Sequence, residues 1–455
     1  MTWERWQPTA EQPWDIRRIV HLHRRAGFGA NWTLIQRDLR EGPDAAIERV
    51  LTGLDRESRI DSVMDGLGNA AVGANRPERL KAWWLLRIVK SPSPLREKLT
   101  LMWHNHFATS NEKVRSLAAM KRQNEQLHTY AAGRFGDLFT AIVKDPAMLV
   151  WLDAPSNKKG RPNENLAREI MELFSLGIGN YSEKDVREAA RALTGWGISN
   201  DGEFRFTERH HDHGMKTILG QIGPWNGYDL LRILIMQPAV SERIAWRLCK
   251  TFMGEGVVTD DLFLVLSKHL RKHDLHIGNA VATMIRSRLF FSDKNIGSRI
   301  SSPVEFVTSA VRSLDCTRPS TVKLAEWTRE LGQDLFYPPN VGGWTGGRNW
   351  LSSRNIIGRA NFASALSEGK LDKIQPMGGG LPGPDFAELV KRQSAGKVNL
   401  DVAVPLLCEL LLGFRLPSEQ NEKLIESLRE HPEGLDRQLK LAVSLILSLP
   451  QAQQS

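Results

Sequence analysis

The chain has 455 residues, of which 41% are hydrophobic and 25% charged, and its 61 basic and 52 acidic residues give a formal net charge of +9. These proportions are typical of a folded globular protein and exclude a largely disordered chain. The basic excess is spread along the sequence without a nucleic-acid-binding motif, so we expect no nucleic acid as a partner.

The chain begins with a segment that lacks the pattern of an export signal. Charged residues such as Glu4, Arg5 and Asp15 interrupt it, and no apolar core of signal-peptide length is present. The densest apolar runs, 230–236 and 441–449, are too short to span a bilayer. We therefore expect a cytoplasmic protein without a transmembrane segment, and the sequence gives no oligomeric state. The 3 cysteines are isolated, so free thiols are expected.

Amphipathic helices dominate the rest of the chain. Apolar residues recur at helical spacing, and Ser182 with Asp185 three residues later forms an acidic variant of the capping box. The one convincing alternating stretch, 203–207, predicts a hairpin strand that leads into a histidine-rich loop. The predicted helices span residues 78–90, 95–107, 163–176, 182–194, 241–252, 260–272, 277–287, 303–314 and 321–332.

Glycine and proline interrupt the helical pattern twice in the last third of the chain. Residues 337–350 are irregular and glycine-rich, and residues 376–384 have the composition of a linker. Three more helices follow, at about 401–413, 418–430 and 435–448. The sequence therefore predicts a mainly α protein with short irregular or hairpin insertions. We divide it into a large helical domain (1–370), a linker (371–398) and a small C-terminal helical unit (399–455).

The helix at 163–176 carries an unusual density of polar side chains. Glu164, Arg168 and Glu172 fall on one stripe, with Glu169 beside it. One interpretation is an ion-pair ladder on a solvated face, worth roughly 0.2–0.5 kcal/mol per pair. The other is a set of metal ligands or of general acids and bases. Asp153 precedes this helix and is expected to reach its N-terminus, so we include it among the catalytic candidates.

Histidines gather in two short segments. His104 and His106 point about 200° apart on a regular helix, so they bind one metal only at an unwound helix end. The alternative places one of them in the core and one at a site. In the second segment, His211 and Asp212 are good ligands for a divalent transition metal, and Lys216 has the charge to hold an anionic group.

Tryptophan is frequent, with 14 residues against 4 tyrosines. Core packing explains most of them, because tryptophan is usually well buried. Trp344 and Trp350 belong to the irregular glycine-rich segment, where their flat faces suit a sugar or an aromatic ligand.

Six motifs follow one another in an order that resembles the bacterial domain of unknown function 1800. They are HLHRRAGFG at 21–29, WHNHF at 103–107, NEN through ELF at 163–174, TGW at 194–196, HDHGMKT at 211–217 and PPNVGGW at 338–344. The resemblance covers about residues 15–365 and implies a mostly helical fold without an established activity. It also implies a sulfatase-like partner encoded nearby. Because many members carry export signals, it implies a periplasmic or envelope location, from which this chain departs.

Two functions fit these observations. The first is a metal-dependent hydrolase or transferase acting on a polar, saccharide-like or anionic substrate. The glutamate helix and the His211–Asp212 loop would then line one pocket, with His104 among the metal ligands and Arg168 and Lys216 holding the anion. The second is a non-catalytic envelope or assembly protein that binds the sulfatase-like partner or a glycan through its tryptophan-rich loops. Serine-hydrolase, P-loop and dinucleotide fingerprints are absent from the sequence.

Overall fold

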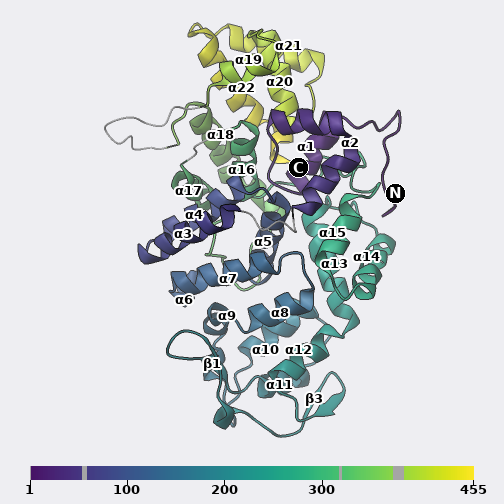
Figure 1. Cartoon of the computed structure of the whole chain (residues 1–455), viewed down its shortest axis with the longest axis vertical. Coiled ribbons are helices and arrows are strands. Elements are labelled where there is room, and N and C mark those ends of the chain that lie inside the picture. The colour runs from purple at the N-terminus through teal and green to yellow at the C-terminus, as the bar shows by residue number, and fades with distance from the viewer. Residues whose placement is uncertain (1, 54–58, 317–319, 372–383) are drawn as a thin grey trace.

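The computed structural model describes residues 2–53, 59–316, 320–371 and 384–455. Within these ranges, 22 α-helices accompany two small antiparallel sheets, which confirms the predicted mainly α fold (Figure 1). None of the described helices combines the length and the apolar character needed to cross a bilayer. The three cysteines are free thiols.

The first third of the chain is a series of helices, and α1, α2, α6, α7 and α9 each begin with an N-cap side chain that accepts a backbone hydrogen bond. Proline occupies the first turn of α4 and α5, where its missing N–H group leaves no hydrogen bond unmade. The elements are α1 (Ile16–Arg25), α2 (Trp32–Thr52), α3 (Arg59–Gly73), α4 (Pro77–Lys90), α5 (Pro94–His106), α6 (Asn111–Val114), α7 (Leu117–Thr129), α8 (Phe135–Val143) and α9 (Pro146–Trp151).

The middle of the chain holds both sheets and a π-helix. The predicted strand at 203–207 is present as β2, which pairs with β1, and the predicted capping box of Ser182 and Asp185 begins α11. The predicted glutamate helix changes from α to π geometry after Glu169. The elements are η1 (Ala154–Ser156), α10 (Asn165–Glu169), the π-helix η2 (Ile170–Ser175), α11 (Glu183–Ala192), β1 (Trp196–Ile198), β2 (Phe204–Phe206), η3 (Glu208–His210), β3 (Lys216–Ile218), β4 (Gln221–Gly223) and α12 (Gly227–Ile235).

The last part of the chain is again helical. Its elements are α13 (Pro238–Phe252), α14 (Asp260–Lys272), α15 (Ile277–Ile285), α16 (Pro303–Ser313), α17 (Thr321–Glu330), η4 (Gly347–Leu351), α18 (Ser353–Ser367), α19 (Phe386–Gln393), α20 (Leu400–Leu412), α21 (Ser418–Arg429), α22 (Gly434–Ser448) and η5 (Pro450–Gln453). In Figure 1 the last helices form one end of the molecule, and the two sheets lie at the opposite end.

Two hydrophobic clusters form the core. One connects α5 and α8 with α10–α15, and the other connects α1, α4, α16 and α18 with the C-terminal helices. Phe362 of α18, Leu407 of α20 and Ile446 of α22 belong to the second cluster, and all three are fully buried. The C-terminal helices therefore share their core with the N-terminal part of the chain. Of the predicted linker, residues 372–383 lie outside the described ranges, and α19 occupies part of the remainder.

Candidate functional site

The predicted glutamate helix has most of its charged side chains engaged by neighbouring residues. Arg168 pairs with Glu164 at 2.9 Å and with Glu183 of α11 at 2.8 Å. This arrangement agrees with the interpretation of the stripe as an ion-pair ladder. The second partner of Arg168, however, is Glu183 of α11 and not Glu172. Glu172 instead accepts a hydrogen bond from the hydroxyl of Tyr181. Burial, and then the nearby Glu172, raise the pKa of Glu169.

Asp153 lies before this helix, as the sequence predicts. Its carboxylate accepts hydrogen bonds from Lys113 Nζ at 2.8 Å and from Asn165 Nδ2 at 3.1 Å, at the first residue of α10. Its backbone is in the left-handed region with φ of 59°. Asp153 therefore fastens α10 to the segment before it.

The His211–Asp212 loop is fastened to α11 and to the residues that follow it. Arg191 Nε donates to Asp212 at 2.8 Å, and these hydrogen bonds lower the pKa of Asp212 to about 2. His211 Nδ1 donates to the carbonyl of Thr194 at 2.8 Å. Lys216 is buried, and its ammonium donates to the carbonyls of Asp212 and Gly214. The lysine thus closes the loop with two of its three N–H donors, and its role in holding an anion stays a prediction.

His104 and His106 make separate contacts. The N–H of Phe336 donates to His104 Nε2 at 3.2 Å, and burial lowers the pKa of His104 to about 3. His106 Nε2 donates to the carbonyl of Phe174 at 3.0 Å, at the end of the π-helix. Burial, together with Arg247 and Arg243, holds the pKa of His106 well below its usual range. Both histidines are therefore neutral side chains of the interior.

The four predicted metal ligands do not gather into one group. His106 contacts the end of the glutamate helix, His104 packs against Trp84 and Phe336, and Asp212 is paired with an arginine. Throughout the described ranges, no group of three or more histidine, cysteine, aspartate or glutamate side chains is arranged to hold a metal ion. The transition metal stays a prediction.

A cavity with a volume of about 790 Å³ lies between α5, α13 and the glycine-rich segment at 344–350. Figure 1 shows α5 and α13 near the middle of the molecule. From α5 the cavity is lined by one helical stripe at i, i+3, i+4 and i+7, which consists of Lys98, Leu101, Met102 and Asn105. Its volume is in the range of small-molecule sites.

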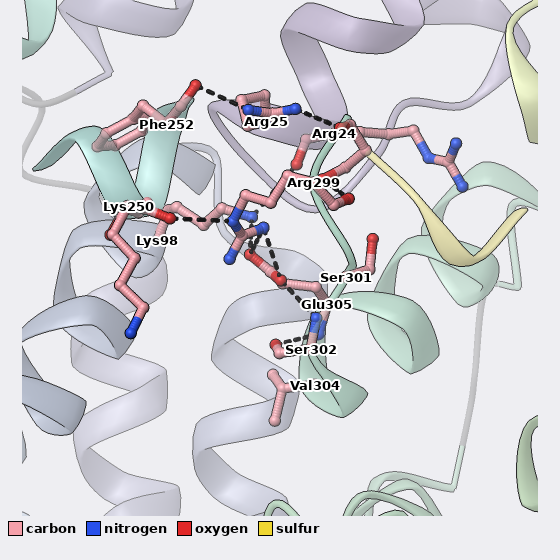
Figure 2. Close-up of polar contacts among 12 residues, drawn as sticks. Arg24, Arg25, Lys98, Lys250, Phe252, Arg299, Ser301, Ser302, Val304 and Glu305 are labelled. Atoms are coloured by element: carbon pink, nitrogen blue, oxygen red, sulfur yellow. Dashed lines mark hydrogen bonds and ion pairs between the residues drawn. The ribbon is translucent and has the colours of Figure 1, made fainter. Parts of the chain in front are cut away.

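One wall of the cavity is a closed ion-pair cluster. Figure 2 shows Lys98, Arg299 and Glu305 pointing toward one another from α5, the segment before α16 and the first turn of α16. Lys98 Nζ lies 2.6 Å from Glu305, and one guanidinium nitrogen of Arg299 lies 3.0 Å from both carboxylate oxygens. Burial alone would raise the pKa of Glu305, but Arg299 and Lys98 hold it below its usual range. Both cations contact the one carboxylate, so the cluster carries one surplus positive charge.

Arg247 of α13 lines the cavity with a buried guanidinium that has no counterion. Only 7% of the residue is exposed, and among the described residues no carboxylate and no hydrogen-bond acceptor contacts its guanidinium. Three cations, Arg243, Arg247 and Lys250, lie 4.9, 5.2 and 5.0 Å from the ring centroid of Trp246. Burial and then Arg243 lower the pKa of Arg247 to about 9, so it is charged at neutral pH.

The neighbouring cations on α13 have different surroundings. Arg243 donates from two nitrogens to the carbonyl of Leu173 in the π-helix, at 3.2 and 3.0 Å, and it is attracted by Glu172. Lys250 is exposed at the edge of the cavity. Among the described residues, Arg247 is therefore the buried cation on this face of α13 that lacks a counterion.

The opposite wall comes from the glycine-rich segment. Trp344 and Trp350, which the sequence singles out, both line the cavity and are 7% and 8% exposed. Asn105 of α5 accepts a hydrogen bond from the N–H of Trp344 and donates one to its carbonyl. Asn105 is the middle residue of the WHNHF motif, so the motif reaches the cavity through its asparagine and not through its histidines.

The residues of this cavity, apart from the two tryptophans, were not among the predicted site residues. A signal was present on α13, where Arg243, Trp246, Arg247 and Lys250 occur at i, i+3, i+4 and i+7 without an acidic neighbour on the stripe. Like charges four residues apart destabilise a helix, so such a stripe favours a binding role over a structural one.

The chain was compared with known families, proteins and structures. The family model described as "Protein of unknown function (DUF1800)" matches residues 21–454. The match includes the C-terminal helices, which lie beyond the part covered by the motif resemblance. No curated protein and no solved structure matches the chain.

Proposed function

Because the chain belongs to the family described as "Protein of unknown function (DUF1800)", membership brings no activity with it, and we propose that the protein binds an organic anion in the cavity between α5 and α13. The observation that carries this proposal is the buried, unpaired guanidinium of Arg247 in the cavity wall.

The proposal follows from the energetics of buried charge. Removing an ion from water costs several kcal/mol, and a counterion recovers much of that cost. Glu305, a buried carboxylate in the cavity wall, is already paired with both Lys98 and Arg299. An anion bound at Arg247 would supply the missing counterion, and Lys250 at the edge adds to the attraction.

None of the predicted catalytic residues lines this cavity. Those candidates, Asp153, Glu164, Arg168, Glu169, Glu172 and Lys216, belong to the region of α10, α11 and β3. We therefore propose binding as the function of the cavity. Hydrolase or transferase activity stays a separate proposal for the other region, and the sulfatase-like partner and the envelope location stay predictions from the resemblance.

The binding proposal is tested by calorimetry at fixed ionic strength. Acetate, phosphate and hexanoate are titrated into the wild type, Arg247→Met and Arg232→Met. Arg232 is an exposed arginine of α12 that pairs with Asp229, so it controls for loss of one surface charge. We expect at least one probe to bind the wild type and Arg232→Met, and to bind Arg247→Met at least tenfold more weakly. Equal binding to all three proteins, or to none, overturns the proposal.

The predicted metal is tested independently. Elemental analysis by mass spectrometry is applied to the untagged wild type, His211→Ala and Glu169→Ala. About one transition-metal ion per chain, lost in both variants, would confirm the sequence prediction of a shared metal site. Absence of metal from three folded samples contradicts it and leaves the anion site unaffected.

A further inference from the structure

We infer that the ligand of this cavity is an amphiphilic organic anion, with one charged head group and an apolar body. The inference rests on the proposed function and specifies the chemistry of its ligand. It distinguishes two kinds of ligand for a tryptophan-rich cavity. A sugar ring needs walls with free hydrogen-bonding groups, whereas an apolar chain needs walls without them.

The head group is expected at Arg247, where a single buried charge is unpaired. Lys98 and Arg299 also line the cavity, but the carboxylate of Glu305 occupies both of them. Lys98 is further held by the carbonyls of Arg24 and Gly27, at 3.2 and 2.9 Å. Of the described residues that line the cavity, Arg247 is the buried cation without a counterion, and it suits one anionic group, such as a carboxylate with two acceptor oxygens.

The walls beyond the head group are largely apolar. On the α5 side, Leu101 and Met102 face the cavity, and on the other sides hydrophobic side chains from several segments complete it. These further side chains are Met253, Val258, Phe263, Ile300, Trp344 and Trp350. An apolar body placed against them would lose contact with water, which is favourable in proportion to the area covered.

The polar side chains inside the cavity are already used by the protein. Asn105 is bonded to the backbone of Trp344, and Gln333 Oε1 accepts from the N–H of Val304 at 3.0 Å. Thr251 and Ser298 donate to backbone carbonyls at 2.9 and 2.6 Å. A sugar ring would bring several hydroxyl groups that need new partners, and a buried hydroxyl without one is unfavourable.

Polar side chains that are free of protein partners lie at the mouth. Thr345, Asn349 and Asp260 are exposed, and in the part of the chain that the structure describes their side chains make no hydrogen bond or ion pair. Arg348 and Glu255 face each other there at 3.7 Å. The cavity therefore combines exposed polar side chains at its mouth, buried polar and ion-paired side chains that the protein already uses, and apolar side chains that leave room for the body of an amphiphile whose head group lies at Arg247.

The test compares ligands with the same head group and different bodies. Butanoate, hexanoate, octanoate and the sugar acid glucuronate are titrated, below their aggregation concentrations, into the wild type and Arg247→Met. We expect the association constant to rise about three- to fourfold for each added methylene until the cavity is filled. Glucuronate is expected to bind at least tenfold more weakly than hexanoate, which has a body of similar length.

A wall variant provides a second measurement. Met102→Gln places an amide in the apolar wall at nearly constant volume, so it should reduce the gain in affinity per added methylene. A constant affinity along the series, or stronger binding of glucuronate than of hexanoate, overturns the inference. If those ligands still depend on Arg247, the proposed function survives and only the amphiphile is wrong. If no ligand depends on Arg247, the proposed function fails as well.

Discussion

Asn105 binds both backbone groups of Trp344. Its Oδ1 accepts the N–H of Trp344 at 2.7 Å, and its Nδ2 donates to the carbonyl of the same residue at 3.2 Å. One side-chain amide thus pairs with the glycine-rich segment as a neighbouring strand would. The segment stays close to the end of α5, and the indole of Trp344 stays in the cavity wall.

Replacing this asparagine should loosen the wall. Asn105→Ala removes two hydrogen bonds, each worth about 1 kcal/mol, so we expect the free energy of unfolding to fall by about 2 kcal/mol. Hexanoate binding should weaken several-fold because the wall is no longer fixed. Urea unfolding and calorimetry measure the two effects. Asn200→Ala, at an exposed position outside the cavity lining, should leave hexanoate binding unchanged, and unaltered binding in Asn105→Ala would contradict the role of this contact.

The close contact between Asn105 and the glycine-rich segment requires a glycine at position 343. Gly343 has φ of 75°, and a Cβ there would lie 2.2 Å from Asn105 Oδ1 and 2.5 Å from its carbonyl oxygen. Gly347 also has a positive φ, 59°, but a Cβ there meets nothing within 4 Å. Both alanine variants bear the backbone strain, of order 1 kcal/mol. We expect urea unfolding to show that Gly343→Ala loses at least 1 kcal/mol more of the free energy of unfolding than Gly347→Ala does. Equal losses in the two variants would contradict the steric explanation.

Removing the unpaired cation should make the ligand-free protein more stable. Arg247→Met retains the length of the side chain and removes a buried charge that has no partner, so the free energy of unfolding should rise by about 1 kcal/mol or more. The melting temperature of the variant should also stop responding to hexanoate. Calorimetric melting with and without hexanoate measures both. A destabilised Arg247→Met would mean that the guanidinium already has a stabilising partner in the free protein.

Asp145 is expected to make stability depend on pH. It caps α9, where its Oδ1 accepts from the N–H groups of Ala147 and Met148 while its Oδ2 is buried without a partner. Burial raises its pKa from 3.8 to about 7. Between pH 3.8 and pH 7, the carboxyl of Asp145 therefore keeps its proton in the folded state and has lost it in the unfolded state. The stabilisation from this proton is complete below pH 3.8 and is lost as the pH rises through 7.

Asp145→Asn isolates this contribution, because asparagine is also a good helix cap and does not titrate. Relative to the variant, the wild type should lose stability on the order of a few kcal/mol between pH 4 and pH 8. Urea unfolding of both proteins across that interval measures the difference. Parallel curves for the two proteins would show that this carboxyl does not titrate in the folded state as described.

Much of the fold could be predicted because its signals are local. The predicted helix at 95–107 corresponds to α5, and the helix at 241–252 corresponds to α13, which begins earlier because Pro238 fits the first turn. The π-helix was not predicted. Its wider turn is stabilised by partners from other helices, such as Arg243, and a sequence pattern does not show which partners a helix will meet.

The site was harder to predict than the fold. Trp344 and Trp350 were identified because aromatic residues among glycines are conspicuous, but Arg247 looked like one more charge on an amphipathic helix. Its significance depends on being buried without a counterion, which is decided only by the packing of α13 against α14, α15 and the π-helix and by its position opposite α5 across the cavity. The histidines of WHNHF drew attention by their chemistry, whereas the stripe that contains Lys98 and Asn105 determines what faces the cavity.

The π-helix restricts the number of residues that this segment can contain. The side chain of Ser175 and those of His106 and Arg243 bind the carbonyls of Ile170, Phe174 and Leu173. Deleting one residue here would restore an ordinary helix, turn the glutamates on its N-terminal side by about 100° and withdraw these carbonyls from their partners. Side-chain substitutions along this segment can keep these carbonyls in place, whereas a deletion of one residue would separate them from their partners.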